Sequence, residues 1–149
     1  VFASTTASTM MYTYFIFAVS LSIPVRAQMT TSLAYSPVYG DASLPLSRLA
    51  CSDGSNGLES KGYTTLGSFS DFPYLGGAPT IADWNDPNCG KCYAITYGKN
   101  TIKVIALDVS KDGFTVSPQA MDTLTDGQAN ALGRVEVTAA EVPASECSL

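Results

Sequence analysis

Thr101-Ile-Lys-Val-Ile-Ala-Leu-Asp-Val109 is the stretch of this sequence that decides its fold. Successive side chains of a strand point to opposite faces, and here both sets are largely apolar. Such a pattern is typical of a central strand covered on both sides. Asp108 falls on the apolar face near the end of the stretch, where a carboxylate is costly unless it is hydrogen-bonded or at a barrel mouth.

Further short strands lie on either side of this central stretch. Strands are expected over Leu33–Tyr39, Cys92–Tyr97 and Arg134–Thr138 from their composition and alternation. We expect the first to be an edge strand, because it contains Pro37. Residues 98–100 form a hairpin turn.

Two short helices complete the pattern. Ser117 and Pro118 predict an N-cap and the first residue of one helix, and residues 128–132 predict a second. Ile81–Trp84 is expected to form a single helical turn. Short strands joined by Gly- and Pro-rich loops, with two small helices, indicate a closed β-barrel.

Composition limits the classes of function. The chain has 149 residues, enough for one domain, and a net charge of -5. This acidic balance disfavours nucleic acid as a partner, because such partners need a dense basic face. Histidine is absent, which excludes Ser-His-Asp and Cys-His catalysis and His-ligated metals. We expect neither a metal nor a cofactor.

The start of the chain has the pattern of an export signal. Residues 10–23 are almost wholly apolar, too short a run for the ~20 residues of a bilayer span. Val25-Arg26-Ala27 resembles a small-x-small cleavage site, so residues 1–27 are expected to be a signal peptide and residues 28–149 the mature domain. No Lys or Arg precedes the run, and the alternative is an interfacial or buried helix. The prediction is a secreted protein without membrane association after processing.

The four cysteines agree with export. An even number in a small exported chain predicts two disulfides, and three connectivities are open. Cys89-Gly-Lys-Cys92 also allows a redox pair or half of a zinc site. A redox pair would be expected in a βαβ unit, and the flanking sequence does not show one. A zinc site usually has a second pair of ligands, and Cys51 and Cys147 each stand alone in the sequence.

Several motifs in order complete the pattern across the mature chain. They are Cys51-Ser-Asp-Gly-Ser-Asn-Gly-Leu58, Phe72-Pro-Tyr-Leu-Gly-Gly77, Ala82-Asp-Trp84, Cys89-Gly-Lys-Cys92, Leu107-Asp108, Gly113-Phe114 and Ala131-Leu-Gly-Arg-Val135. In this order the sequence resembles the cerato-platanin family of small secreted fungal proteins. The resemblance implies a mainly β fold, a single six-stranded double-psi β-barrel similar to that of expansins, with disulfides Cys51–Cys89 and Cys92–Cys147.

The resemblance also implies a function without catalysis. It implies binding of chitin oligomers or another cell-wall polysaccharide, expansin-like loosening, and elicitation of plant defence responses. The protein is then extracellular or in the fungal cell wall, a monomer, with a plant surface receptor as a further expected partner. The expected carbohydrate-binding residues are Asp108, Asp53, Gly54, Tyr63, Thr115 and Ser117. Thr115 and Ser117 stand where relatives often have Asn.

Two alternatives stay open on the residues alone. A cell-wall glycoside hydrolase on the same barrel needs a second carboxylate beside Asp108, and the candidates are Asp53, Asp83, Asp86 and Asp112. A surface-active coat protein is suggested by the low charge and the loop aromatics. Tyr63, Tyr74, Trp84 and Tyr93 are candidates for a sugar-stacking platform, although we expect Trp84 to be mostly structural.

Overall fold

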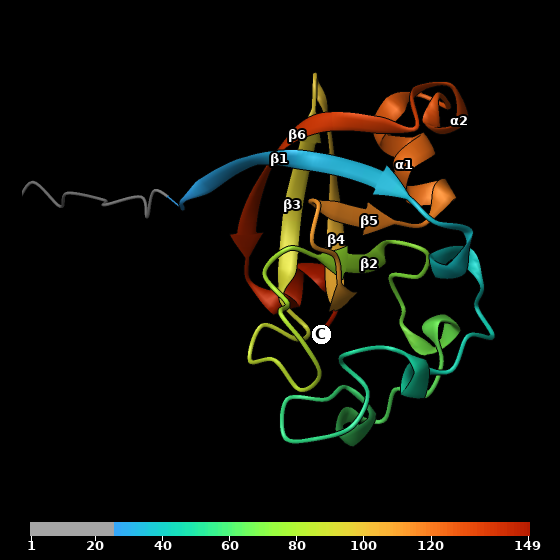
Figure 1. Cartoon of the computed structure of the whole chain (residues 1–149), viewed down its shortest axis with the longest axis vertical. Helices are drawn as coiled ribbons and strands as arrows, with labels where there is room; N and C mark the ends of the chain where they lie inside the picture. The colour runs from blue at the N-terminus through green and yellow to red at the C-terminus, as the bar shows by residue number, and fades with distance from the viewer. Residues whose placement is uncertain (1–25) are drawn as a thin grey trace, which may run out of the picture.

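Six strands form a closed barrel in the computed structural model, which describes residues 26–149 (Figure 1). Around the barrel the order is β1-β5-β2-β4-β3-β6, with parallel pairs β1·β5 and β2·β4. The six-stranded barrel is therefore confirmed. Of the expected signal peptide, residues 1–25 lie outside the described part. The strands are β1 Gln28–Tyr35, β2 Leu75–Ala78, β3 Cys92–Tyr97, β4 Asn100–Val109, β5 Phe114–Val116 and β6 Arg134–Val142.

β4 has the central place that its sequence predicts. It lies between β2 and β3, and Val104, Ile105 and Leu107 are fully buried although they point to both faces. Helix α1, Pro118–Thr125, packs against it, and Ser117 caps this helix as expected. The second predicted helix is α2, Ala129–Leu132. Neither helix of this described part has the length and apolar character needed to cross a bilayer.

The strand β2 was not predicted, because its glycines favour a turn-rich segment. Gly76 pairs with both β4 and β5, and a Cβ added there would collide with the carbonyl oxygen of Thr115. Glycine is therefore required for the close approach of three backbones. The partner strand β5 is only three residues long, too short for an alternating pattern to reveal.

Two further expectations need correction. The first strand runs from Gln28 to Tyr35 and has neighbours on both sides, so it is not an edge strand. Pro37 instead begins a 3₁₀ turn, Pro37–Gly40, because its fixed φ suits a first helical position. Residues 81–84 form a bend and a turn rather than a helical turn, and Asn85 follows with φ 60°.

Irregular segments cover the lower part of the barrel in Figure 1. Between β1 and β2 the chain makes short 3₁₀ turns that bury Leu46, Leu58 and Leu66. The disulfide Cys51–Cys89 joins this layer to the loop before β3, and Cys92–Cys147 joins β3 to the last turn, Ala144–Cys147. The pairing implied by the family resemblance is confirmed.

Reduction of the disulfides is expected to lower the thermal stability sharply. The bridges span 38 and 55 positions, and each loop closure contributes roughly 3–4 kcal/mol in the chain-entropy model. Circular dichroism melts with and without reductant measure the effect. The paired substitutions C51S/C89S and C92S/C147S measure the contribution of each disulfide to thermal stability separately. An unchanged melting midpoint in either variant would contradict the prediction for that disulfide.

Candidate functional site

Asp108 lies near the end of β4 with its carboxylate held by three donors. The Tyr39 hydroxyl donates to Oδ2 at 2.9 Å, while the backbone N–H groups of Ala50 and Val109 donate to Oδ1 at 3.1 and 2.9 Å. Each carboxylate oxygen has about two acceptor positions. One position on Oδ2 therefore stays open to a ligand hydroxyl.

Tyr39 is kept as a hydrogen-bond donor by its surroundings. Burial, the charge of Asp108 and the hydrogen bond to it together raise the pKa of Tyr39 far above its ordinary value. The phenol stays protonated across the physiological range. No pattern in the sequence marks Tyr39, because it reaches Asp108 across 69 positions of the chain.

Gly77 is a buried residue beside Asp108, at a position that leaves no room for a side chain. It pairs with Asp108 on one side and Thr115 on the other, so these two residues flank it across the sheet. An added Cβ would lie 2.9 Å from the Cβ of Ser110 and 3.3 Å from the Tyr39 hydroxyl. The Ser110 and Thr115 hydroxyls are themselves hydrogen-bonded at 2.9 Å. Asp108 and Thr115 thus belong to one polar cluster.

A pocket of about 470 Å³ opens next to this cluster. Besides Asp108, it is lined by a second carboxylate, Asp41, and by the exposed Arg48. None of the four acids considered as a second carboxylate is in the lining. The remaining lining residues are apolar: Pro37, Val38, Leu44 and Leu49.

Asp53 and Gly54 lie in a neighbouring loop. The Trp84 indole N–H donates to Asp53 Oδ1 at 2.7 Å, and this bond is the first cause of the lowered pKa of Asp53. Gly54 has φ 88°, and a Cβ there would lie 2.5 Å from Asn85 Oδ1. Asn85 donates its backbone N–H to Ala50, whose own N–H binds Asp108. The loop and the Asp108 cluster are therefore connected through Ala50.

The four aromatic residues considered as a sugar-stacking platform are not all available at the surface. Trp84 is 56% exposed, and its indole N–H binds Asp53, so its side chain is held in the loop without being buried. Tyr93 is buried, and Tyr63 stacks on Phe69 with ring centroids 4.1 Å apart, so one face of Tyr63 is occupied. Tyr74 hydrogen-bonds Thr123.

Ser117 does not belong to a surface site. Its side chain is fully buried, donates to the Pro73 carbonyl at 2.7 Å and accepts from the Ala120 N–H at 3.0 Å. These are the bonds of a helix N-cap. The expectation that Ser117 contacts carbohydrate was therefore wrong.

Two of the groups that could serve as a second carboxylate have lowered pKa values. Hydrogen bonds from Ser43 lower the pKa of Asp41, and backbone N–H groups of Ala82 and Asn88 lower that of Asp86. A general acid in glycoside hydrolysis needs a raised pKa instead. Within residues 26–149, no group of three or more Cys, Asp or Glu side chains could hold a metal ion.

Comparison with known proteins agrees with the barrel fold. The model of the cerato-platanin family matches residues 31–149. The chain belongs to the cerato-platanin family. Proteins of this family are secreted and are generally non-enzymatic elicitors.

Similar cerato-platanins come from several fungi. A heat-stable 19 kDa antigen of Coccidioides posadasii is 50% identical over 120 residues, covering 80% of this chain and 82% of the antigen. The crystal structure of cerato-platanin 3 from M. perniciosa is 46% identical, with a TM-score of 0.78, and covers 81% of this chain and 100% of that one. The solution structure of the fungal elicitor Cerato-Platanin is 36% identical, with a TM-score of 0.70. The match covers 78% of this chain and 96% of that one.

Removal of the Tyr39 hydroxyl is expected to destabilise the fold. Tyr39→Phe removes a hydrogen bond to a charged group, worth roughly 1.5–3 kcal/mol. Denaturant unfolding measures the loss. Tyr97→Phe is the matched control, since the Tyr97 side chain is only partly buried and its hydroxyl makes no hydrogen bond among residues 26–149.

Alkaline titration of the same variants gives a second readout. Because folding raises the pKa of Tyr39, its stabilising contribution is present below the ordinary tyrosine value of about 10 and is lost as pH rises toward the folded value. The wild-type free energy of unfolding should fall above about pH 10, and less steeply in Tyr39→Phe. If the free energy of unfolding fell equally steeply with pH in the wild type and in Tyr39→Phe, folding would not raise the pKa of Tyr39.

Proposed function

We propose that this protein is a secreted, non-catalytic cerato-platanin that binds chitin oligomers or a similar cell-wall polysaccharide in the groove at Asp108. The observation that carries the proposal is the fixed carboxylate of Asp108, which has an open acceptor position and lines a pocket of about 470 Å³. A preorganised acceptor binds a sugar hydroxyl without the entropic cost of ordering a side chain.

The rest of the groove suits a saccharide. Thr115 and Ser110 lie beside Asp108 but outside the pocket lining. Both are partly exposed, and their mutually bonded hydroxyls can also donate to and accept from sugar hydroxyls. Pro37, Val38 and Leu49 supply an apolar wall for the C–H face of a sugar ring. The combination of a few polar groups with an apolar surface is typical of small-ligand pockets.

The loop with Asp53 and Gly54 extends this proposal. The exposed Trp84 indole is oriented by its bond to Asp53, and one of its faces can stack on a further sugar ring. The partly exposed Tyr63 offers at most the face that Phe69 leaves free. Chitin oligomers of increasing length should therefore bind with increasing affinity.

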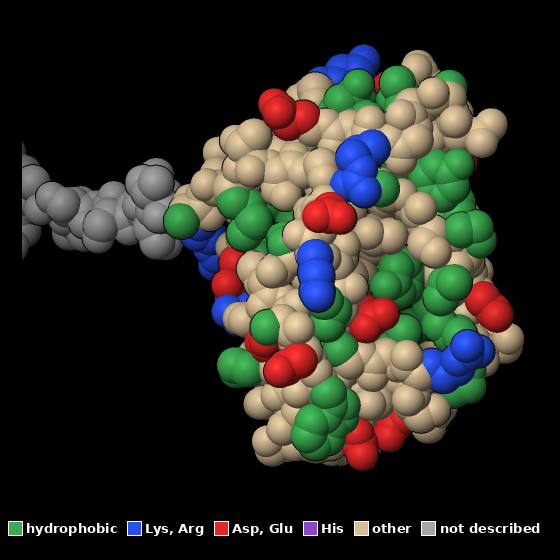
Figure 2. Space-filling view, viewed as in Figure 1, with side chains coloured by type: hydrophobic (Ala, Val, Ile, Leu, Met, Phe, Trp, Pro, Cys, Tyr) green, Lys and Arg blue, Asp and Glu red, His purple; other side chains and the backbone are tan. Residues whose placement is uncertain are grey.

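Loosening of polysaccharide and elicitation of plant defence are the biological outcomes that we propose. A relative of known structure is described as a fungal elicitor, and it shares 36% of its residues with this chain. Elicitation implies a plant surface receptor as a partner. We propose that the protein acts as a monomer. Charged side chains of both signs are interspersed on the face shown in Figure 2, without a continuous basic patch.

A glycoside hydrolase is the second candidate, favoured by one observation. Asp41 and Asp108 line the same pocket, so two carboxylates are present. The lowered pKa of Asp41 disfavours proton donation by this group, and non-catalytic binding is the better reading.

The substitution Asp108→Asn is expected to weaken binding of chitin hexamer roughly tenfold, which equals about 1.4 kcal/mol. The fold should survive, because the Tyr39 hydroxyl can reverse and accept from the new amide. Calorimetry measures the affinity and circular dichroism confirms folding. Glu136→Gln is the matched control, since Glu136 is exposed on β6 and separated from β4 by β3.

Equal affinities of the folded Asp108→Asn variant and the wild type would place the binding site elsewhere. Release of reducing ends from chitin or cellulose by the wild type, lost in Asp108→Asn, would favour the hydrolase.

Signal removal after Ala27 is expected during secretion. The apolar run up to Ile23 and the small-x-small pattern motivate this proposal. Intact mass spectrometry of protein from the culture medium should give a chain that starts at or within a few residues of Gln28. Secreted protein that retains residues 10–23 would contradict it.

A further inference from the structure

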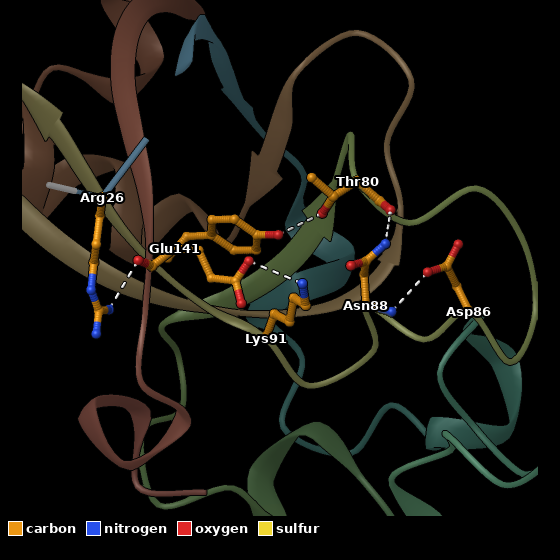
Figure 3. Close-up of polar contacts among 7 residues, drawn as sticks. Arg26, Thr80, Asp86, Asn88, Lys91 and Glu141 are labelled. Atoms are coloured by element: carbon orange, nitrogen blue, oxygen red, sulfur yellow. Dashed lines mark hydrogen bonds and ion pairs between the residues drawn. The ribbon is translucent and has the colours of Figure 1, made fainter. Parts of the chain in front are cut away.

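A second pocket, of about 520 Å³, lies where the start of β3, the end of β6 and the start of β1 meet the loop after β2. Its polar lining includes Arg26, Thr80, Asn88, Lys91 and Glu141, which Figure 3 labels, together with Tyr93. It shares no lining residue with the pocket at Asp108. Its volume falls in the range of roughly 300–1,000 Å³ found for small-ligand sites.

Hydrogen bonds fix the loop wall of this pocket. The hydroxyls of Thr80 and Tyr93 are 2.8 Å apart, and the Asn88 side-chain amide donates to the Thr80 carbonyl at 2.8 Å. The backbone N–H of Asn88 donates to Asp86 Oδ1 at 2.8 Å, and the other oxygen of Asp86 accepts from Ala82.

The covalent frame adds to this rigidity. Cys89 and Cys92 flank Lys91 closely in sequence, and both are in disulfides that lead to distant parts of the chain. The polar groups are therefore positioned before any ligand arrives, which lowers the entropic cost of binding.

The charges of the pocket favour a neutral, hydroxyl-rich ligand. Lys91 Nζ lies 3.0 Å from Glu141 Oε2, and both side chains are partly exposed. An ammonium has three donors and a carboxylate about four acceptor positions, so the pair keeps groups of both kinds for a ligand. Met29, Val142 and Pro143 supply an apolar wall.

Processing of the chain would remove part of the wall of this pocket. Arg26 and Ala27 line it, and Arg26 donates to the backbone carbonyl of Glu141 at 3.0 Å. Cleavage after Ala27 would remove both residues and free that carbonyl. The other five polar residues of the lining all lie in the mature part.

We propose that this pocket binds a second saccharide unit, independently of the groove at Asp108. The inference rests on the proposed function, because it takes the same class of ligand. A protein with two saccharide sites can bind two segments of a polysaccharide at the same time.

The test is a ¹H–¹⁵N NMR titration of the secreted protein with chitin trimer. In Asp108→Asn, the Asn88 side-chain amide and the backbone amides of Lys91 and Glu141 should still shift, with the wild-type midpoint. The double variant K91M/E141Q removes the ion pair without leaving an unpaired charge, and should weaken binding at this pocket about fivefold.

The matched control is K103M/E146Q, which removes the other exposed ion pair, with an N–O distance of 2.8 Å. It should leave the midpoint at the second pocket unchanged. Spectral dispersion reports folding, and Glu141→Gln alone serves as a milder variant if the double variant unfolds.

The outcomes separate the two proposals. Trimer binding at the Asp108 groove without shifts at Asn88, Lys91 and Glu141 would overturn the second site alone. Loss of those shifts in Asp108→Asn would show one continuous site and overturn its independence. Absence of any binding by the wild type would overturn the proposed function together with this inference.

Discussion

Close approach of three backbones at β2 is the constraint on which the rest of the structure depends. Gly76 and Gly77 lie between β4 and β5, and a side chain at either position would meet backbone or side-chain atoms of the neighbouring chain segments. Without glycine at these two positions, β2 could not pair in parallel with β4, and the barrel would not close. The same strand pairs Gly77 with Asp108 and Thr115, so one constraint fixes both the barrel and the neighbours of the candidate site.

The irregular layer is held to the barrel by a few long-range contacts. Ala50 connects two of them, because its N–H binds Asp108 and its carbonyl accepts from Asn85. Asn56 binds Asn85 through its backbone N–H and through its side-chain amide. With the Cys51–Cys89 disulfide, these bonds position the Asp53–Trp84 pair relative to the groove. Loops without regular structure can thus present fixed functional groups.

The sequence predicted the structure correctly where short local patterns determine it. The alternation in β3 and β4, the Ser117-Pro118 cap and the order of the motifs were sufficient for the barrel, the helices and the disulfides. Asp108 became a candidate because a carboxylate interrupts an apolar face. The proximity of Tyr39, Asp41 and Gly77 to Asp108 was not predicted, since only the parallel pairing and the folded 3₁₀ segment bring them there. Ser117 was misjudged because burial depends on tertiary packing that no local pattern reports.

The pairing of the first strand with the last has a consequence for the order of folding. Residues of β1 from Gln28 to Ala34 pair with β6 from Arg134 to Ala140, so the barrel closes across most of the chain length. During synthesis β1 has no partner on that side until β6 has left the ribosome, and Cys92 must wait still longer for Cys147. Closing such a long loop is entropically costly and slows folding. The chain therefore stays open while it emerges, and it acquires its barrel and its second disulfide only at the end.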